Sequence, residues 1–408
     1  MNNKTTYKQT EIGMIPSDWE VKTLGEICEV TSSKRIFESD YVSFGIPFYR
    51  GKEISMLNES KKLDEEYFIS EEKYNGIKSV FGVPTENDIL ITAVGTLGNV
   101  YLVPNKDKFY FKDGNLIWLR NVKHILPCYL SIQLNWLKDE IINNAIGSSQ
   151  KALTIQVLKK QYFPLPPTLA EQTAIATALS DADALISGLE KLIAKKRNIK
   201  QGAMQKLLQP KAGWEVKKLG EVCDVRDGTH DSPKYFESGV KFVTSKNIID
   251  GKLDFTDISY ISIEDAHQVN QRSKVENGDI LMSMIGTIGN AVLVNFEPDF
   301  CIKNVALLKP KKINSIYLLQ LIYSPNFQKY IESKLDGGIQ KFISLGVLRD
   351  LEIPFPTLAE QTRIATILSD IDNEIATLEN KLEKYRKIKI GMMQNLLTGK
   401  IRLVGSST

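Results

Sequence analysis

The sequence predicts an α+β protein in which two similar mixed α/β domains are held apart by two long helices. These helices are expected to form one antiparallel intramolecular coiled coil. Three observations support this fold class. The chain contains an internal repeat, each copy ends in a helix with a 3.5-residue apolar period, and the charge along each helix is polarised. The two halves should therefore be related by a pseudo-twofold axis.

The internal repeat is visible as collinear matches. WEVKTLGEICEV, beginning at Trp19, and WEVKKLGEVCDV, beginning at Trp214, share nine of twelve residues. PTLAEQTAIATALSDAD, from Pro167, and PTLAEQTRIATILSDID, from Pro356, share fourteen of seventeen. The middles of the copies differ. Two similar frames around two dissimilar middles indicate one task performed on two different targets.

The variable middle segments of the two copies are predicted to contain both strands and helices. Short β-rich runs such as GIPFY and DILITAV in the first copy, and GVKFVT and DILMSMI in the second, are separated by Gly, Pro and Asn. Helical runs such as YLSIQLNWLKDEIINNAI follow them. Each copy therefore predicts an α+β globule of about 150 residues, which is large enough to have its own core.

A long helix is predicted from Thr168 to Leu208, and its second copy begins at Thr357. Thr168 and Glu171 form a T-x-x-E capping box, which the second copy repeats with Glu360. At 1.5 Å per residue, about 40 residues give a rod of roughly 60 Å. The predicted seam consists of Ile175, Leu179, Ala182, Ile186, Leu189 and Ile193, and of Ile364, Leu368, Ile371, Ile375, Leu378, Leu382 and Tyr385.

Charge along both helices changes from acidic at the start to basic at the end. Each helix thereby complements its own macrodipole. Two such helices attract each other when they are antiparallel and repel each other when they are parallel. This favours the antiparallel coiled coil over the alternative in which each helix lies on its own domain.

Composition excludes several classes of protein. With 42% hydrophobic and 25% charged residues, the 408-residue chain is an ordinary globular protein. It has no apolar run of about 18 residues and no secretory signal, so we expect a cytoplasmic protein without membrane contact. Four cysteines and three histidines are widely spaced, which predicts no metal site, and Cys28 and Cys223 read as buried core residues. A net charge of +3 permits nucleic-acid binding without arguing for it.

Catalytic motifs are missing, and no catalytic residue is predicted. The sequence has no phosphate loop of the GxxxxGK[ST] type, no GxGxxG after a strand, no HExxH and no GxSxG. The Gly-rich segment from Gly95 to Gly98, repeated from Gly286 to Gly289, is interpreted as a tight hairpin between apolar strands. The alternative is a loop whose backbone approaches a phosphate.

Polar residues in loops of the variable units are the candidate binding residues. Lys and Arg neutralise phosphates, Arg can read guanine, and Gln or Asn can read adenine in the major groove. Gln150-Lys151 and Gln340-Lys341 carry more weight, because both copies keep the pair within divergent surroundings. The candidates are Lys34, Arg35, Arg50, Lys52, Thr96, Gln150, Lys151, Thr229, His230, Lys246, Asn247, Thr287, Gln340 and Lys341.

The order of motifs resembles the specificity subunit of a type I restriction–modification system. It runs WEV..LGE, a variable unit with DIL and GT.GN, a G..QK turn, then P.PTLAEQ or PPTLAEQ opening a long helix, all repeated over essentially the whole chain. The second copy, with DGTHDSPKYFESGVKFVTSKNI, fits most closely, whereas the first lacks DGTH. The resemblance implies target recognition domains at residues 1–166 and 210–355, a central spacer helix at 167–209, and a distal spacer helix with the C-terminal tail at 356–408.

The resemblance also implies the function and the partners. Such a subunit is not itself an enzyme and carries no cofactor. It reads a bipartite, asymmetric double-stranded DNA site. Two modification subunits would bring S-adenosylmethionine and methylate adenine at N6, and two restriction subunits would add ATP- and Mg-dependent translocation and cleavage. A two-headed protein-binding scaffold with a coiled-coil spacer remains an alternative, and so does a self-contained nuclease–methyltransferase, although the missing motifs speak against the latter.

Overall fold

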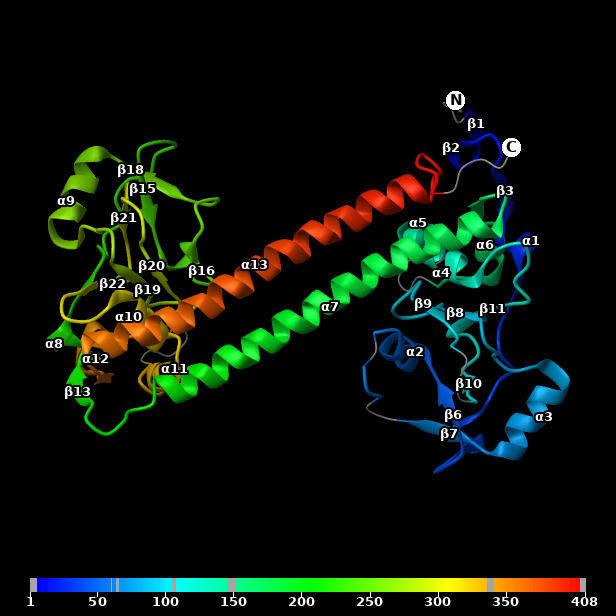
Figure 1. The fold of residues 1–408 in the computed structure, drawn as a ribbon, viewed down its shortest axis with the longest axis horizontal. Helices are drawn as coiled ribbons and strands as arrows, with labels where there is room; N and C mark the ends of the chain where they lie inside the picture. Colours follow the sequence, from blue (N-terminus) through cyan, green and yellow to red (C-terminus); the bar gives the residue numbers. More distant parts are fainter. Residues whose placement is uncertain are drawn as a thin grey trace. The chain divides into compact units, whose positions relative to one another are not determined.

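The computed structural model describes residues 6–59, 61–63, 66–104, 108–145, 152–335 and 341–403. The chain divides into two compact units, the first made of residues 1–188 and 382–408 and the second of residues 189–381. Each unit contains the mixed α/β part of one sequence copy and one end of each long helix (Figure 1). The predicted mixed fold is confirmed in both copies.

The first unit is built on a four-stranded antiparallel sheet in the order β4-β11-β8-β9. A second sheet has the order β10-β6-β7-β5, in which β10 runs parallel to β6. The strands are β1 (Tyr7–Thr10), β2 (Gly13–Pro16), β3 (Glu20–Thr23), β4 (Glu29–Thr31), β5 (Tyr41–Val42), β6 (Ile46–Tyr49), β7 (Tyr67–Ile69), β8 (Ile89–Thr92), β9 (Val100–Leu102), β10 (Tyr110–Phe111), β11 (Leu116–Arg120) and β12 (Tyr162–Leu165).

Short helices connect these strands. Capping residues set several of their boundaries: α3 begins after Ser70, whose side chain accepts a hydrogen bond from Lys73 N, and ends at Gly82 with φ of 81°. The helices of this part are α1 (Leu24–Ile27), η1 (Glu38–Asp40), α2 (Gly51–Asn58), α3 (Glu71–Phe81), α4 (Pro127–Trp136), α5 (Lys138–Asn143) and α6 (Ile155–Lys159).

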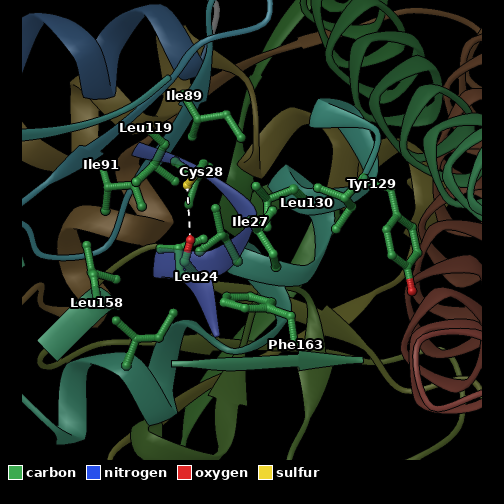
Figure 2. Packing of buried hydrophobic residues seen from close by; sticks show 14 of the residues in the cluster. Leu24, Ile27, Cys28, Ile89, Ile91, Leu119, Tyr129, Leu130, Leu158 and Phe163 are labelled. Atoms are coloured by element: carbon green, nitrogen blue, oxygen red, sulfur yellow. Dashed lines mark hydrogen bonds between the residues drawn. The ribbon is translucent and has the colours of Figure 1, made fainter. Parts of the chain in front are cut away.

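The core of the first unit lies between the four-stranded sheet and helices α1, α4 and α6. Figure 2 shows Ile89 and Leu119 of the sheet facing Leu24 of α1 and Leu130 of α4. Cys28 also lies in this core, and its Sγ donates to Leu24 O at 3.4 Å. Burial raises the pKa of the Cys28 thiol to about 12. The prediction that this cysteine is a core residue is therefore confirmed.

The second unit repeats the four-stranded main sheet and has a second sheet of three strands instead of four. Its sheets have the orders β14-β22-β19-β20 and β18-β15-β21, with β15 parallel to β21. The elements are β13 (Glu215–Lys218), α8 (Leu219–Val222), β14 (Cys223–Asp227), β15 (Val240–Val243), η2 (Ser245–Asn247), β16 (Ile248–Ile249), β17 (Lys252–Leu253), β18 (Ser259–Ile261), α9 (Ile263–Ser273), β19 (Ile280–Ser283), β20 (Ala291–Leu293), β21 (Phe300–Ile302), β22 (Val305–Pro310), α10 (Ser315–Ile322), α11 (Pro325–Ser333), α12 (Leu345–Asp350) and β23 (Glu352–Phe355).

The two long helices are α7 (Leu169–Leu207) and α13 (Leu358–Leu396), each of 39 residues. In the first unit, Leu179 near the start of α7 shares a core with Leu396 at the end of α13. In the second unit, Met204 near the end of α7 shares a core with Leu368 near the start of α13. The helices therefore pack antiparallel, as predicted (Figure 1).

Ion pairs between the helices follow the predicted charge pattern. Lys389 pairs with Asp183 in the first unit. In the second unit, Lys200 pairs with Asp372 at 2.6 Å and Arg197 with Glu379 at 2.6 Å. Late bases of one helix thus meet early acids of the other. Each exposed pair contributes roughly 0–1 kcal/mol, so the pairs favour the antiparallel orientation more than they stabilise the fold.

The starts of the long helices show half of each predicted capping box. Glu171 N donates to Thr168 Oγ1 at 3.2 Å, but the Glu171 carboxylate, only 1% exposed, binds Arg402 instead of the backbone. The Glu360 carboxylate likewise binds Arg363. A charged donor within reach displaces the backbone N–H as the partner, since charge-assisted hydrogen bonds are stronger.

Candidate nucleic-acid interface

Strand ends gather at one edge of the main sheet in each unit. Leu116 pairs with Thr92 and Trp118 with Thr31, so the end of β4, the start of β11 and the end of β8 share an edge. The second unit has the same register between β14, β22 and β19. We call these loops the loop edges. They comprise residues 32–35, 50–52, 95–98 and 112–115 in the first unit, and 228–230, 244–246, 286–289 and 303–304 in the second.

Strand register makes positions on the two loop edges equivalent. Leu116 pairs with Thr92 as Val305 pairs with Ser283, so the residues before them, Asn115 and Asn304, correspond. Lys112 N donates to Tyr49 O and Lys303 N to Val243 O, both at 2.9 Å. By the same counting, the equivalent pairs are Arg35 and His230, Lys52 and Lys246, Thr96 and Thr287, and Lys112 and Lys303.

Arg35 and His230 occupy equivalent positions although the first copy lacks the DGTH letters. Arg35 Nε donates to Asp113 Oδ2 at 2.9 Å, and the Arg35 side chain is 69% exposed. His230 Nδ1 lies 2.6 Å from Asn304 Oδ1, and its Nε2 lies 2.8 Å from Asp227 Oδ2. In both units, a polar residue of the turn before the central strand therefore contacts this exposed side chain: Asp113 contacts Arg35, and Asn304 contacts His230.

The loop that carries His230 has a sterically determined backbone. A Cβ on Gly228 would lie 2.3 Å from Ile302 O, so only glycine fits between the two chains. Gly228 N donates to Val305 O at 3.0 Å, and Asn304 N donates to Thr229 O at 3.2 Å. Thr229 is half-buried and is held mainly through its backbone. The DGT segment thus positions His230.

Arg50, Lys52 and Thr96 line one surface groove together with Asn115. Arg50 binds Glu53 through Nε (3.1 Å) and Nη2 (2.7 Å) and stacks on a tyrosine ring. The Glu53 carboxylate raises the pKa of Arg50 above its ordinary value. Lys52 and Thr96 are exposed. The structure therefore brings Arg50 and Lys52, candidates from one segment of the sequence, together with Thr96 from another.

Asn247, which the sequence proposes as a DNA contact, has a structural role. It is 2% exposed, and its Oδ1 accepts from Thr244 N and Oγ1 at 3.0 and 3.1 Å. Its Nδ2 donates to Asp254 O and Asp257 O. With its amide fully used inside the protein, Asn247 supports the loop instead of reaching outward. The neighbouring Lys246 is exposed and pairs with Asp257 at 2.7 Å.

The Gly-rich segments are hairpin turns, which confirms the favoured interpretation. Between β8 and β9, Gly98 N donates to Thr92 O at 2.8 Å, and between β19 and β20, Gly289 N donates to Ser283 O at 3.1 Å. Gly95 and Gly98 have φ of 79° and 72°, values that favour glycine. Thr96 and its equivalent Thr287 are exposed in these turns.

The remaining candidates fall into two groups. Lys34 is exposed, and its Nζ lies 4.4 Å from the centre of the Phe81 ring. Gln150, Lys151 and Gln340 lie outside the described residues, whereas Lys341 is described and exposed. Two residues after each of these Gln-Lys pairs, the chain contacts the residue that follows β8 or β19, next to the loop edge. Leu153 N donates to Ala93 O at 3.0 Å, and Ile343 N to Met284 O at 3.2 Å.

Sequence reasoning missed the turn before the central strand of each unit. Both copies keep a lysine and an asparagine there, in FKDGNLIWL and IKNVALL. The first copy inserts Asp113 and Gly114 between them, and this difference hid the correspondence. Lys303 Nζ donates to Ser232 Oγ at 2.5 Å, so this turn also contacts the loop after His230.

The loop edges carry charged and polar side chains that are suited to binding. Among the described residues, no group of three or more His, Cys, Asp or Glu side chains could hold a metal ion. Within the same part of the chain, no helix is long and apolar enough to cross a membrane. What the edges offer is exposed cations and half-buried amides at the end of a sheet, an arrangement that fits a polyanion with readable polar edges.

Comparisons with known proteins agree over nearly the whole chain. Residues 16–201 and 211–385 match the family described as Type I restriction modification DNA specificity domain. The type I restriction enzyme MjaVIII specificity subunit of Methanocaldococcus jannaschii is 28% identical over 432 residues, covering 97% of this chain and 96% of that protein.

Two solved structures share the fold. The crystal structure of the type I restriction–modification S subunit from M. genitalium has a TM-score of 0.60 at 16% identity, covering 97% of each chain. A chain from a structural study of complex assembly and conformational transition in the type I R-M system has a TM-score of 0.59 at 19% identity, covering 95% of this chain and 99% of that one.

Proposed function

The chain belongs to the type I restriction–modification DNA specificity family and is a specificity subunit, not a catalytic one; from this premise we propose that it reads a bipartite, asymmetric site in double-stranded DNA. Each mixed α/β domain would contact one half-site through its loop edge. The observation that carries this proposal is that the two loop edges have the same frame and different side chains. Arg35 stands where the second unit has His230, and Arg50 where it has Thr244. Different side chains at equivalent positions favour different half-sites.

The proposed division of the chain follows from this function. Residues 1–166 and 210–355 would be the two target recognition domains. Residues 167–209 would form the central spacer helix, and residues 356–408 the distal spacer helix with the C-terminal tail. The packing of α13 supports this division. Its residue Leu396 belongs to the core of the first unit, and its residue Leu368 belongs to the core of the second. Helices anchored in this way would fix the number of base pairs between the half-sites.

The catalytic steps would belong to partner subunits. Two modification subunits with S-adenosylmethionine would methylate adenine at N6, and two restriction subunits would use ATP and Mg to translocate and cleave DNA in the cytoplasm. The relative from M. jannaschii is named as a subunit of a restriction enzyme, which supports membership of a larger complex. On this chain, the proposed DNA contacts are the half-buried Arg50 and the exposed candidates Lys34, Arg35, Lys52, Thr96, His230, Lys246, Thr287 and Lys341.

Mapping of methylated bases in the source genome, with and without an intact gene for this chain, tests the proposal. We expect one bipartite adenine-methylated motif to disappear on deletion. If the modification subunits are expressed and active and no such motif is lost, the proposal is wrong. Binding of the assembled complex to DNA should also weaken steeply with salt. A complex with no DNA affinity at any salt concentration would indicate the two-headed scaffold instead.

A further inference from the structure

Arg35 is the loop-edge residue whose guanidinium is held at one nitrogen only. Its Nε donates to Asp113 Oδ2 at 2.9 Å. Its Nη1 and Nη2 have no hydrogen-bond partner among the described residues. The Arg35 side chain is 69% exposed, whereas that of Asp113 is only 17% exposed. A mostly buried carboxylate thus fixes the base of an exposed guanidinium and leaves both terminal nitrogens available as donors.

The comparable side chains are committed to internal partners. Arg50 uses both Nε and Nη2 on Glu53 and stacks on Tyr67 with its guanidinium carbon 4.2 Å from the ring centre. His230, which is equivalent to Arg35, has one ring nitrogen on Asp227 and the other on Asn304. Arg50 also keeps an unused Nη1–Nη2 edge, but its side chain is only 29% exposed and is stacked on the tyrosine. The two ring nitrogens of His230 point apart, so a histidine cannot offer two parallel donors to one base. Among these three side chains, Arg35 is the one that combines an unused pair of donors with a mostly exposed side chain.

The unused donors have a specific chemical complement. Guanine presents two acceptors, O6 and N7, side by side in the major groove, and the two N–H groups of an arginine fork match them. A carboxylate on Nε fixes the plane of the fork before binding, which reduces the entropic cost of ordering it. A phosphate contact would not require a fork fixed in one plane, because lysine also binds phosphate as a simple point charge.

We propose that Arg35 reads a guanine in the half-site bound by the first recognition domain, and that Asp113 is a positioning residue that orients the Arg35 guanidinium. This inference rests on the proposed function, because it requires the first loop edge to face DNA. We expect the pair to have little effect on stability, because the guanidinium end of the ion pair is mostly exposed to solvent. Substitutions should therefore leave the fold intact.

The test uses the full-length chain assembled with its modification subunits and the site found by methylation mapping. Arg35→Ala should weaken binding roughly 5- to 150-fold and abolish discrimination at one G·C pair of the first half-site. Arg35→Lys should not restore discrimination, because lysine lacks the fork. Asp113→Asn should cause a smaller loss at the same base pair. Lys73→Ala, which removes another cation held by a carboxylate of the first unit, is the matched control and should bind normally.

Guanine N7 provides an independent readout. 7-Deazaguanine at the contacted position should weaken binding by the wild-type complex and cause no further loss in Arg35→Ala, because both changes remove the same contact. The proposal is overturned if Arg35→Ala weakens binding equally on all sequences with a shallower salt dependence, which indicates a phosphate contact. It is also overturned if binding is unchanged or if only the second half-site is affected. Failure of the proposed function is distinct, because the wild-type complex would then recognise no bipartite site.

Discussion

Residues that look alike in the sequence have different tasks once their surroundings are known. Lys246 and Asn247 are neighbours in one loop, and both read as DNA contacts from the sequence. The structure separates them, because Lys246 is exposed and Asn247 is buried with its whole amide hydrogen-bonded. Glu53 in the first unit is the counterpart of Asn247, since its carboxylate accepts from Arg50 N at 2.8 Å. Both units thus use a buried acceptor to cap the segment that carries a lysine.

Asn247→Ala should destabilise the second unit by about 1–3 kcal/mol, because it leaves buried backbone groups without partners. The neighbouring change Lys246→Ala should leave the melting temperature almost unchanged. In the assembled complex, Lys246→Ala should instead weaken DNA binding uniformly and reduce the salt slope by about 1. Calorimetric melting and salt-dependent binding of both variants distinguish these effects. Equal melting of the two variants would contradict the assigned roles.

At the level of elements, apolar periodicity predicted the long helices well. The predicted helix from Thr168 to Leu208 is observed as Leu169–Leu207, and the antiparallel packing follows the predicted charge pattern. Periodicity did not predict the depth of burial, because Ile371 belongs to the predicted seam and is only half-buried. Depth depends on what packs against the helix, which a single-helix pattern does not contain.

Burial should therefore decide how much a leucine of α13 contributes. Leu368 is fully buried in the core of the second unit, whereas Leu358 at the start of the same helix is 63% exposed. Leu368→Ala should lower the free energy of unfolding by about 2–5 kcal/mol through lost contacts and the cavity that remains. Leu358→Ala should change it little. Denaturant unfolding of the two variants makes the comparison, and similar losses would show that α13 does not pack as described.

The start of α13 should also give a pH dependence. The Arg363 guanidinium, with a further contribution from Lys211, lowers the pKa of Glu360 from 4.5 to about 2. Because the folded-state pKa is depressed, the ion pair stabilises the fold above pH 4.5, and this stabilisation is lost as pH falls towards 2.

Glu360→Gln removes this titrating group. The melting temperature of the variant should fall less steeply than that of the wild type between about pH 5 and pH 2. The measurement belongs at low ionic strength, because salt screens a partly exposed pair. Identical slopes for both proteins would rule out this contribution.

The sequence predicted the whole molecule better than the candidate site. The internal repeat and the helical seam are one-dimensional patterns, so they gave the two mixed domains and the antiparallel helices directly. Contacts such as Arg35 with Asp113 join residues far apart in the chain and depend on strand register. The two-residue insertion before Asn115 also hid its equivalence to Asn304. Only the sheets bring these positions together.

At the scale of the whole molecule, the repeated frame predicts that recognition is modular. Residues 226–352 include the entire loop edge of the second unit and exclude both long helices. Exchanging this segment for the corresponding segment of another family member should therefore alter one half-site of the methylated motif. The first half-site should persist because its loop edge is untouched, and the spacing should persist because α7 and α13 keep their anchoring residues.

Methylated-base mapping of cells that carry the exchanged chain provides the measurement. A control exchange between family members with the same second half-site should leave the motif unchanged, which separates loss of assembly from change of specificity. A change in both half-sites would contradict one recognition domain per half-site. A change in spacing alone would place the determinants of spacing within the recognition domain. The expected result, one new half-site at the original spacing, requires that each loop edge reads DNA independently of the other.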